Sequence, residues 1–328
     1  MGIAVLIYIG AIRVDTGIIT QGAVVALYNY MTQILVELVK FANLIISITK
    51  SVACAGRISA VLETPVESGE GTAEIDEKSE NIVEFRNVSF MYDGAGENSL
   101  ENISFTVKKG ETVGIIGGTG SGKSTVISLI PRFYDATDGK VLIEGKDIKD
   151  YPLEQLRKKI GIVPQRAVLF KGTIRENMRW GKENATDEEI WRALELAQAR
   201  DFVEQKPEKL DTMITQGGKN LSGGQRQRLT IARALVMRPD ILILDDSSSA
   251  LDYATAEKLR KALAESFSET TVFIVSQRAA NIRLADKIIV LDDGQIAGIG
   301  THSRLFADCP EYREICLSQM SEKEAQNG

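Results

Sequence analysis

Apolar residues crowd the first part of the chain and become periodic only after it. Residues 1–12, MGIAVLIYIGAI, are nearly all apolar but are too few to cross a bilayer, which needs about 20 residues. No basic segment precedes them, as a signal peptide would require. A polar turn is expected at 13–17, and the second apolar segment, 21–49, is long enough to span a membrane. A soluble amphipathic helix is the alternative for this second segment.

The pattern changes after an acidic stretch rich in Glu, Gly and Ser, which predicts a linker over 63–80. Short alternating runs follow, and then continuous apolar runs at 112–117, 240–246, 271–276 and 287–294, which are typical of strands buried on both faces. Helical stretches separate them, and one opens on a capping box, Thr186 followed by Glu189. Strands that alternate with helices predict an α/β domain with a mainly parallel sheet over 81–318, followed by a tail at 319–328.

Composition narrows the function classes. The 328 residues carry a net charge of -6, which argues against a nucleic-acid partner, since such a surface needs clustered Lys and Arg. Cys54, Cys309 and Cys316 lack metal-site spacing, and their odd number is a poor disulfide framework. His302 is the only histidine in the sequence.

A phosphate-binding loop lies directly after the apolar run 112–117. Residues 117–124 read GGTGSGKS and match the pattern G-x-x-x-x-G-K-[ST] between a strand and a helix. Glycines let successive backbone N–H groups point inward toward an anion, and the following helix adds its positive end. The predicted phosphate-binding residues of this loop are Gly117, Gly118, Thr119, Gly120, Ser121, Gly122, Lys123, Ser124 and Thr125.

Magnesium ligands are predicted around the same loop. The Ser124 hydroxyl is the usual Mg²⁺ ligand of such a motif. Asp245 ends the apolar run ILILDD about 120 residues later, where a second carboxylate that organises Mg²⁺ belongs in P-loop enzymes. The sequence therefore predicts ATP and Mg²⁺ as cofactors.

Residues 221–225 read LSGGQ, followed by RQRLTIARAL. With the P-loop upstream and ILILDD downstream, residues 81–318 resemble the ATP-binding cassette (ABC) family. The resemblance implies a P-loop core with an antiparallel β subdomain and a helical subdomain. It also implies that Tyr92 stacks on adenine and that Gln165 senses Mg²⁺ and the γ-phosphate. The loop 249–252 would touch an opposite domain.

The same resemblance implies that two such domains enclose two ATP molecules. The LSGGQ segment of one domain closes over the P-loop ATP of the other, so the residues donated to a partner's nucleotide are Ser222, Gly223, Gly224 and Gln225. The start of the helix that follows presents backbone N–H groups to an anion, which suits this role. The expected partner is therefore a second ABC half-transporter.

Residues 1–62 extend the resemblance to ABC exporters. They are similar to the end of the fifth membrane helix and to the sixth helix of an exporter half. About four further helices of that arrangement would be missing, as in a truncated gene product or a fragment. The resemblance implies a multi-pass protein of the plasma membrane in contact with lipid, with its nucleotide domain in the cytoplasm. The exported substrate is unknown.

Two residues depart from the family pattern. Asp246 stands where the family has a Glu that polarises the attacking water, and Gln277 stands where it has a switch histidine. His302 matches a different, structural position. Glutamine can hydrogen-bond a phosphate but cannot titrate. Asp246, Gln277 and Gln165 are the predicted catalytic residues, and the departures resemble the slow site of a heterodimeric exporter.

Asp246 and Gln277 are also compatible with other functions. Asp246 could suffice, which would make the protein a self-sufficient homodimer. A near-inactive regulatory subunit that gates another protein would carry the same two departures. A soluble ABC ATPase of DNA maintenance or translation is disfavoured by residues 1–49 and by the negative charge.

Overall fold

The computed structural model describes residues 1–64, 79–247, 251 and 253–319, and the chain divides into two compact units, 1–67 and 68–328. Most of the predicted linker (63–80), most of the tail (319–328) and all but Leu251 of the loop 249–252 lie outside the described residues.

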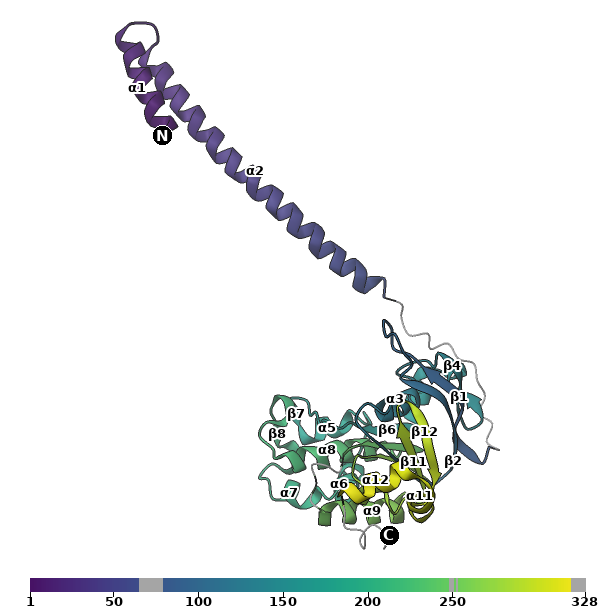
Figure 1. The fold of residues 1–328 in the computed structure, drawn as a ribbon. Helices are drawn as coiled ribbons and strands as arrows, with labels where there is room; N and C mark the ends of the chain where they lie inside the picture. Colours follow the sequence, from purple (N-terminus) through teal and green to yellow (C-terminus); the bar gives the residue numbers. More distant parts are fainter. Residues whose placement is uncertain (65–78, 248–250, 252, 320–328) are drawn as a thin grey trace. The chain divides into compact units, whose positions relative to one another are not determined.

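The first unit is a pair of helices that lie side by side, α1 (Gly2–Asp15) and α2 (Gln21–Leu62) (Figure 1). The side chain of Thr20 accepts a hydrogen bond from the Ala23 amide and caps α2. Gly10 is buried against Val24, and a Cβ at Gly10 would lie 2.7 Å from the Val24 side chain. The turn predicted at 13–17 falls later, because α1 continues through Asp15.

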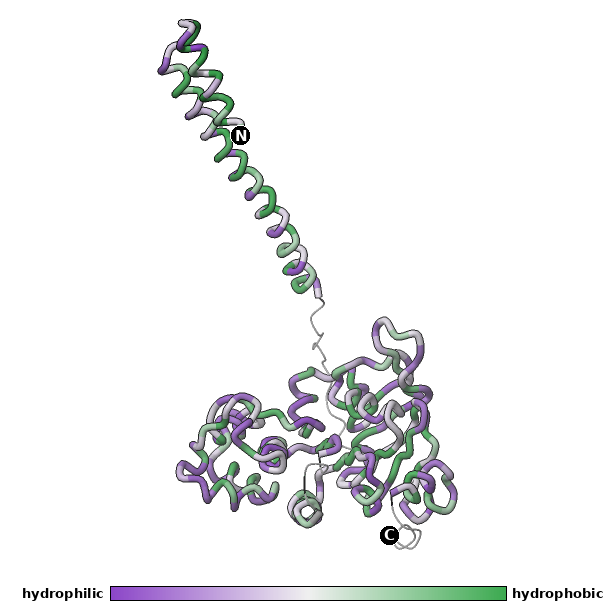
Figure 2. The backbone as a smooth tube through the Cα atoms, turned by 60° about the vertical axis from the view of Figure 1, so that its left-hand side comes forward, coloured by the Kyte–Doolittle hydropathy of each residue, from purple (hydrophilic) through white to green (hydrophobic). Residues whose placement is uncertain are grey.

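Most large apolar side chains of these two helices are exposed. Leu38, Phe41 and Ile45 on α2 are 61%, 60% and 51% exposed, and hydrophobic residues colour much of both helices in Figure 2. Among the described residues, α2 is the one helix long and apolar enough to cross a membrane. So much apolar surface requires lipid or another protein to cover it.

The second unit is built on a six-stranded sheet with the strand order β12-β11-β3-β10-β9-β6. All its neighbours pair in parallel except β11 and β12, which are antiparallel. Its strands are β3 (Thr112–Gly117), β6 (Ile160–Val163), β9 (Ile241–Asp245), β10 (Thr271–Val275), β11 (Lys287–Asp292) and β12 (Gln295–Gly300). The predicted buried strands are confirmed, whereas β12 was not predicted.

A four-stranded antiparallel sheet, β2-β1-β4-β5, packs beside this core. Its strands are β1 (Asn81–Phe90), β2 (Leu100–Lys108), β4 (Asp138–Ile143) and β5 (Lys146–Asp147). One apolar cluster joins the two sheets, with Phe85 and Phe105 stacked at 4.5 Å and Ile115 of β3 fully buried.

Helices complete the second unit (Figure 1). A second apolar cluster unites the helical part with one side of the parallel sheet, and a third lies under the last helices. The helical part holds α5 (Ile174–Arg179), α6 (Asp187–Leu196), α7 (Arg200–Glu204), α8 (Gly223–Val236) and the small sheet β7 (Gly172–Thr173) with β8 (Met213–Ile214). The remaining helices are α3 (Lys123–Leu129), α4 (Leu153–Lys158), α9 (Tyr253–Ser266), α10 (Ala279–Ile282), α11 (His302–Asp308) and α12 (Pro310–Gln319). Single 3-10 turns lie at Ile148–Asp150, Lys209–Asp211 and Gln216–Gly218.

The predicted fold class is confirmed by this architecture, which has a parallel core, an antiparallel β sheet and a helical part. The predicted capping box is also present, since Thr186 and Glu189 exchange hydrogen bonds at the start of α6.

Candidate functional site

Three neighbouring strands of the parallel sheet end at one edge. Val275 of β10 is in register with Ile115 of β3 on one side and with Asp245 of β9 on the other. The loop 117–122, Asp246 and Gln277 follow these three strands in the sequence. Sites in parallel α/β sheets form at the carboxyl ends of the strands, so the topology brings the predicted residues to one place.

Glycine is required at two points of the loop 117–122. Gly120 and Gly122 have φ angles of +86° and +93°, which favour glycine. A Cβ at Gly122 would also lie 2.6 Å from the Leu100 side chain. The loop can therefore turn its backbone tightly before α3 begins at Lys123. Residues 118–120 are exposed at its rim.

Lys123 is buried at the base of the loop and folds back on it. Its Nζ atom donates to the Gly117 carbonyl at 2.9 Å, to the Gly118 carbonyl and to Ser121 Oγ at 3.2 Å. Burial lowers the pKa of the Lys123 ammonium, and the charges of Asp245 and Asp246 oppose that shift. The Lys123 ammonium is bound only by neutral oxygen atoms in these hydrogen bonds. Binding of an anion beside it is therefore favourable, because charge-assisted hydrogen bonds are stronger than those to neutral oxygens.

Asp245 and Asp246 form an acidic pair near Lys123. Burial raises the pKa of Asp245, the neighbouring charge of Asp246 raises it further, and Lys123 opposes both. Burial also raises the pKa of Asp246, although Gln165 and Arg278 oppose the shift. Gln165 Nε2 donates to Asp246 Oδ2 at 3.4 Å, so the structure brings these two predicted residues together.

An open cavity of about 680 Å³ runs from the phosphate-binding loop toward Tyr92. The Tyr92 hydroxyl lies 3.2 Å from Thr125 Oγ1, which links the aromatic ring to the start of α3. Of the predicted residues, those that line the cavity are Tyr92, Gly120, Gly122, Lys123, Ser124 and Thr125. Tyr134 packs edge-on against Tyr92, with ring centroids 5.2 Å apart.

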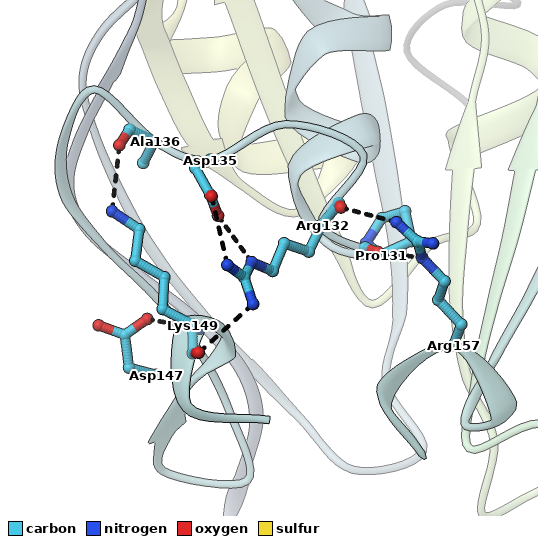
Figure 3. A network of polar contacts seen from close by, with 7 residues as sticks. All are labelled: Pro131, Arg132, Asp135, Ala136, Asp147, Lys149 and Arg157. Atoms are coloured by element: carbon cyan, nitrogen blue, oxygen red, sulfur yellow. Dashed lines mark hydrogen bonds and ion pairs between the residues drawn. The ribbon is translucent and has the colours of Figure 1, made fainter. Parts of the chain in front are cut away.

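A polar network supports the loop that carries Tyr134 (Figure 3). Arg132 donates to the Asp135 carboxylate at 2.7 Å and to the Lys149 carbonyl at 3.3 Å, and Arg157 donates to the Arg132 carbonyl at 3.1 Å. The hydrogen bond from Arg132 lowers the pKa of Asp135. Arg132 itself has a positive φ of 54°. The network therefore fixes a turn that brings Tyr134 against Tyr92.

The predicted residues of the LSGGQ segment stand apart from this cavity. Ser222 is the N-cap of α8, where Ser222 and Gln225 exchange hydrogen bonds at 3.2 and 3.1 Å. Ser222 and Gly223 are exposed and Gly224 is half-buried. The described residues that line the cavity do not include 221–225. A single copy of the domain therefore does not join the two predicted halves of the site.

Gln277 and His302 occupy different surroundings. Gln277 is exposed in the loop between β10 and α10. His302 is buried, and its Nδ1 atom lies 2.9 Å from the Tyr312 hydroxyl in the cluster under the last helices. This position agrees with a structural histidine.

Sequence reasoning missed part of the cavity wall. The residues concerned are Ala95, Gly96, Glu97, Asn98, Ser99, Asp293 and Gly294. The Glu101 amide donates to the Gly294 carbonyl at 2.9 Å, so the turn after β11 is tied to β2. The dipeptide Asp293-Gly294 was a visible turn signal, but its nearness to the P-loop follows only from the pairing of β11 with β3.

The family description "ABC transporter" matches residues 100–249. An uncharacterized ABC transporter ATP-binding protein of Bacillus subtilis is 44% identical over 97% of this chain and 55% of its own length. An ATP-dependent lipid A-core flippase of Syntrophus aciditrophicus is 37% identical over 98% of this chain and 53% of its own. The solved structure of a bacterial Atm1-family ABC exporter with ATP bound has a TM-score of 0.77 and 33% identity, over 93% of this chain and 53% of that one.

This chain carries the ATP-binding domain of the ABC transporter family. It spans about half the length of the curated relatives it matches. The family prediction is confirmed, and ATP as the bound nucleotide follows from the family.

Proposed function

We propose that this chain binds and hydrolyses ATP to drive export across a membrane, as the ATP-binding part of an ABC exporter. The observation that carries the proposal is the cavity that runs from Tyr92 to the P-loop, which Lys123 lines and where the charges of Asp245 and Asp246 act on Lys123. The names of relatives, a flippase and an exporter, agree with transport. Helix α2 meets the length and apolarity that a membrane span needs.

The cavity suits a nucleoside triphosphate. Its inner end offers the Lys123 ammonium and a backbone that bends at Gly120 and Gly122, and both favour a polyphosphate. Its outer end offers the Tyr92 ring, which Tyr134 and Phe90 support by edge contacts at 5.2 and 4.7 Å. An aromatic ring at the end of the cavity opposite the phosphate-binding loop suits a purine base, which can stack on it.

The acidic pair suits Mg²⁺. The charge of Asp246 raises the pKa of Asp245, and a divalent cation beside the two carboxylates would favour their ionised form. Ser124 and Asp245 would hold the ion, with Gln165 nearby, because hard oxygen ligands are what Mg²⁺ prefers. When bound, the ion neutralises charge on the phosphates.

Asp246 and Gln277 would act on the water that attacks the γ-phosphate. Asp246 has a positive φ of 42°, and its carboxylate accepts a hydrogen bond from Gln165 at 3.4 Å. It is one methylene shorter than Glu, and a misplacement of about 1 Å can cost roughly 100-fold in rate. Gln277 offers the γ-phosphate a hydrogen bond without a charge.

A second ABC domain would complete the site. The N-terminus of α8 is exposed at Ser222 and Gly223, and residues 221–225 are not among those that line the cavity. We propose a heterodimer in which this chain's own site is slow and its LSGGQ segment completes the partner's site. The support for this arrangement is the pair Asp246 and Gln277 beside an intact LSGGQ.

The test is steady-state ATPase of the purified full chain in detergent, alone and mixed with a candidate partner, with Lys123→Ala as the inactive control. Activity that appears only on mixing, is lost with Ser222→Ala and survives Asp246→Asn supports the heterodimer. Turnover by the chain alone, with second-order dependence on its concentration, would establish a homodimer instead. Absence of any stabilisation by Mg-ATP would overturn the proposed function itself.

A regulatory subunit is the second candidate, because the same two departures would suit a site that binds ATP without hydrolysing it. Stabilisation by Mg-ATP that depends on Lys123, with no turnover from this site or from the mixed pair, would favour it.

A further inference from the structure

Gln319, the last residue of α12, binds the loop after β10 at two backbone atoms. Its Nε2 donates to the Gln277 carbonyl at 2.7 Å, and its Oε1 accepts from the Ala279 amide at 3.0 Å. The single side chain therefore spans the loop on both sides of Arg278. The two contacts join segments that are 42 and 40 residues apart in sequence.

The loop needs this support because its own residues do not cap the helix that follows. Helix α10 begins at Ala279, and its N-cap residue Arg278 makes no side-chain cap hydrogen bond. The first amides of a helix have no partner within it. Gln319 satisfies one of these amides from a distant part of the chain, whereas Ser276 Oγ accepts from the Arg278 amide at 3.0 Å.

Gln319 is exposed, but the helix that carries it is anchored. Tyr312 and Cys316 of α12 are fully buried in one apolar cluster with Ala279 and Ile282 of α10. Tyr312 is held further by its contact with His302. The position of Gln319 relative to the loop is thus set by the packing of α12 on α10.

The strand before the loop is also joined to the acidic end of the candidate site. The positive charge of Arg278 opposes the rise in the pKa of Asp246. The Asp246 amide donates to the Val275 carbonyl at 2.9 Å. Residues 275–279 therefore lie between Asp246 and the last turn of α12.

We propose that Gln319 is a positioning residue, which holds the backbone of Gln277 and Ala279 so that the Gln277 side chain is presented to the γ-phosphate. The inference rests on the proposed function, since it concerns ATP at this same site. Gln319 does not line the nucleotide cavity. Its effect falls on turnover and leaves nucleotide affinity in place.

The test compares three variants of the full chain in its active assembly. Gln319→Ala removes both hydrogen bonds, Gln319→Glu keeps the acceptor for the Ala279 amide, and Leu317→Ala is the control on an exposed position of the same helix. The loss of about 1 kcal/mol of hydrogen bonding at the loop lowers kcat about fivefold in Gln319→Ala, with KM for ATP within about twofold of wild type. Gln319→Glu recovers part of kcat, and Leu317→Ala matches wild type.

Hydrogen exchange provides a readout that does not depend on turnover. The Ala279 amide exchanges faster in Gln319→Ala than in Gln319→Glu or wild type, and Mg-ATP protects residues 277–279 in wild type but less in Gln319→Ala. Unchanged kcat together with unchanged exchange in Gln319→Ala would overturn the positioning role alone. Failure of the wild-type chain to bind Mg-ATP would instead overturn the proposed function.

Discussion

At the scale of single residues, the candidate site is an electrostatic balance among Lys123, Asp245 and Asp246. Burial disfavours the charged form of each group. The charge of Lys123 lowers the pKa of both carboxylates, and the charges of the two carboxylates raise the pKa of Lys123. Such a balance costs stability in the absence of ligand, and the proposed binding of phosphate and Mg²⁺ would relieve it.

Asp245→Asn removes one of the two repelling carboxylates, so the ligand-free protein becomes more stable by about 1 kcal/mol, which is roughly 2–4 °C in Tm. The pKa of Asp245 is raised in the fold from its usual 3.8. The penalty of its charge is therefore absent in acid, and it develops as pH rises through the raised pKa. Thermal melts of both proteins between pH 4 and pH 8 should show a difference that grows with pH. A variant less stable than wild type at pH 8 would contradict this. Stabilisation by Mg-ATP should fall sharply in Asp245→Asn.

Asp246→Glu combined with Gln277→His restores the side chains that the family pattern has at these positions. We expect turnover at this site to rise by about tenfold or more, because a longer carboxylate reaches the water better and an imidazole adds a stronger contact to the phosphate. Single-turnover ATPase of the assembled protein measures the change. Unaltered turnover in the double variant would argue that the site is limited elsewhere and that it is not degenerate.

The sequence predicted the chemistry-bearing residues but only part of the cavity that surrounds them. Lys123 and Asp245 were predicted because local sequence patterns mark them. Tyr134 was missed because its place against Tyr92 depends on the Arg132 network, and Asp293-Gly294 because strands far apart in sequence pair there.

At the scale of elements, α8 combines a structural cap with a proposed recognition surface in one residue, Ser222. Its hydroxyl accepts from the Gln225 amide, and the same exposed hydroxyl would meet the partner's nucleotide. Two substitutions can separate these roles, because Asp is as good an N-cap as Ser but is repelled by phosphate.

Ser222→Asp should keep the stability of the free chain within about 0.5 kcal/mol of wild type yet abolish ATPase at the site that Ser222 completes. Ser222→Ala should lose about 1 kcal/mol of stability as well as activity. Chemical denaturation and ATPase of the assembled pair provide the two readouts. Full activity in Ser222→Asp would show that this residue does not meet a nucleotide.

Strands with a strong apolar pattern were predicted from the sequence, whereas a strand with a weak apolar pattern was not. Strand β12 (Gln295–Gly300) contains two glycines, so it lacks the β-branched run that marks β9 or β10. It forms because β11 offers an edge and because Gly298 permits the close approach of Leu305 and Cys309, whose atoms would lie 2.9 and 3.1 Å from a Cβ there. Tertiary packing decides such a strand, and a local pattern cannot reveal it.

At the scale of the whole molecule, the two units differ in how much of their apolar surface is exposed. The second unit buries its apolar residues in three clusters, whereas α1 and α2 expose theirs. The proposed location of α2 in a membrane accounts for this contrast.

Leu38→Lys combined with Ile45→Lys places two charges in the apolar part of α2, at a cost of about 2.5–3.5 kcal/mol each in a bilayer. The variant should be released from membranes by alkaline carbonate, while Val52→Lys, beyond the apolar stretch, should remain. ATP binding by the released protein checks that the second unit is still folded. Retention of the double variant in the membrane would contradict a spanning α2.

Helix α2 also continues without a break through Leu62, past the end of its apolar stretch near Thr49. Residues 50–62 form a stiff extension of about 20 Å beyond that stretch. The end of this extension would move by roughly 3–4 Å for every 10° that the helix tilts, and it would return by the same distance when the tilt is reversed. A continuous helix would therefore transmit a tilt of its apolar part to its far end, as long as the helix stays rigid. A pair of glycines at Val52 and Ala53 would leave both ends of the helix folded and yet uncouple the movement of one from the other.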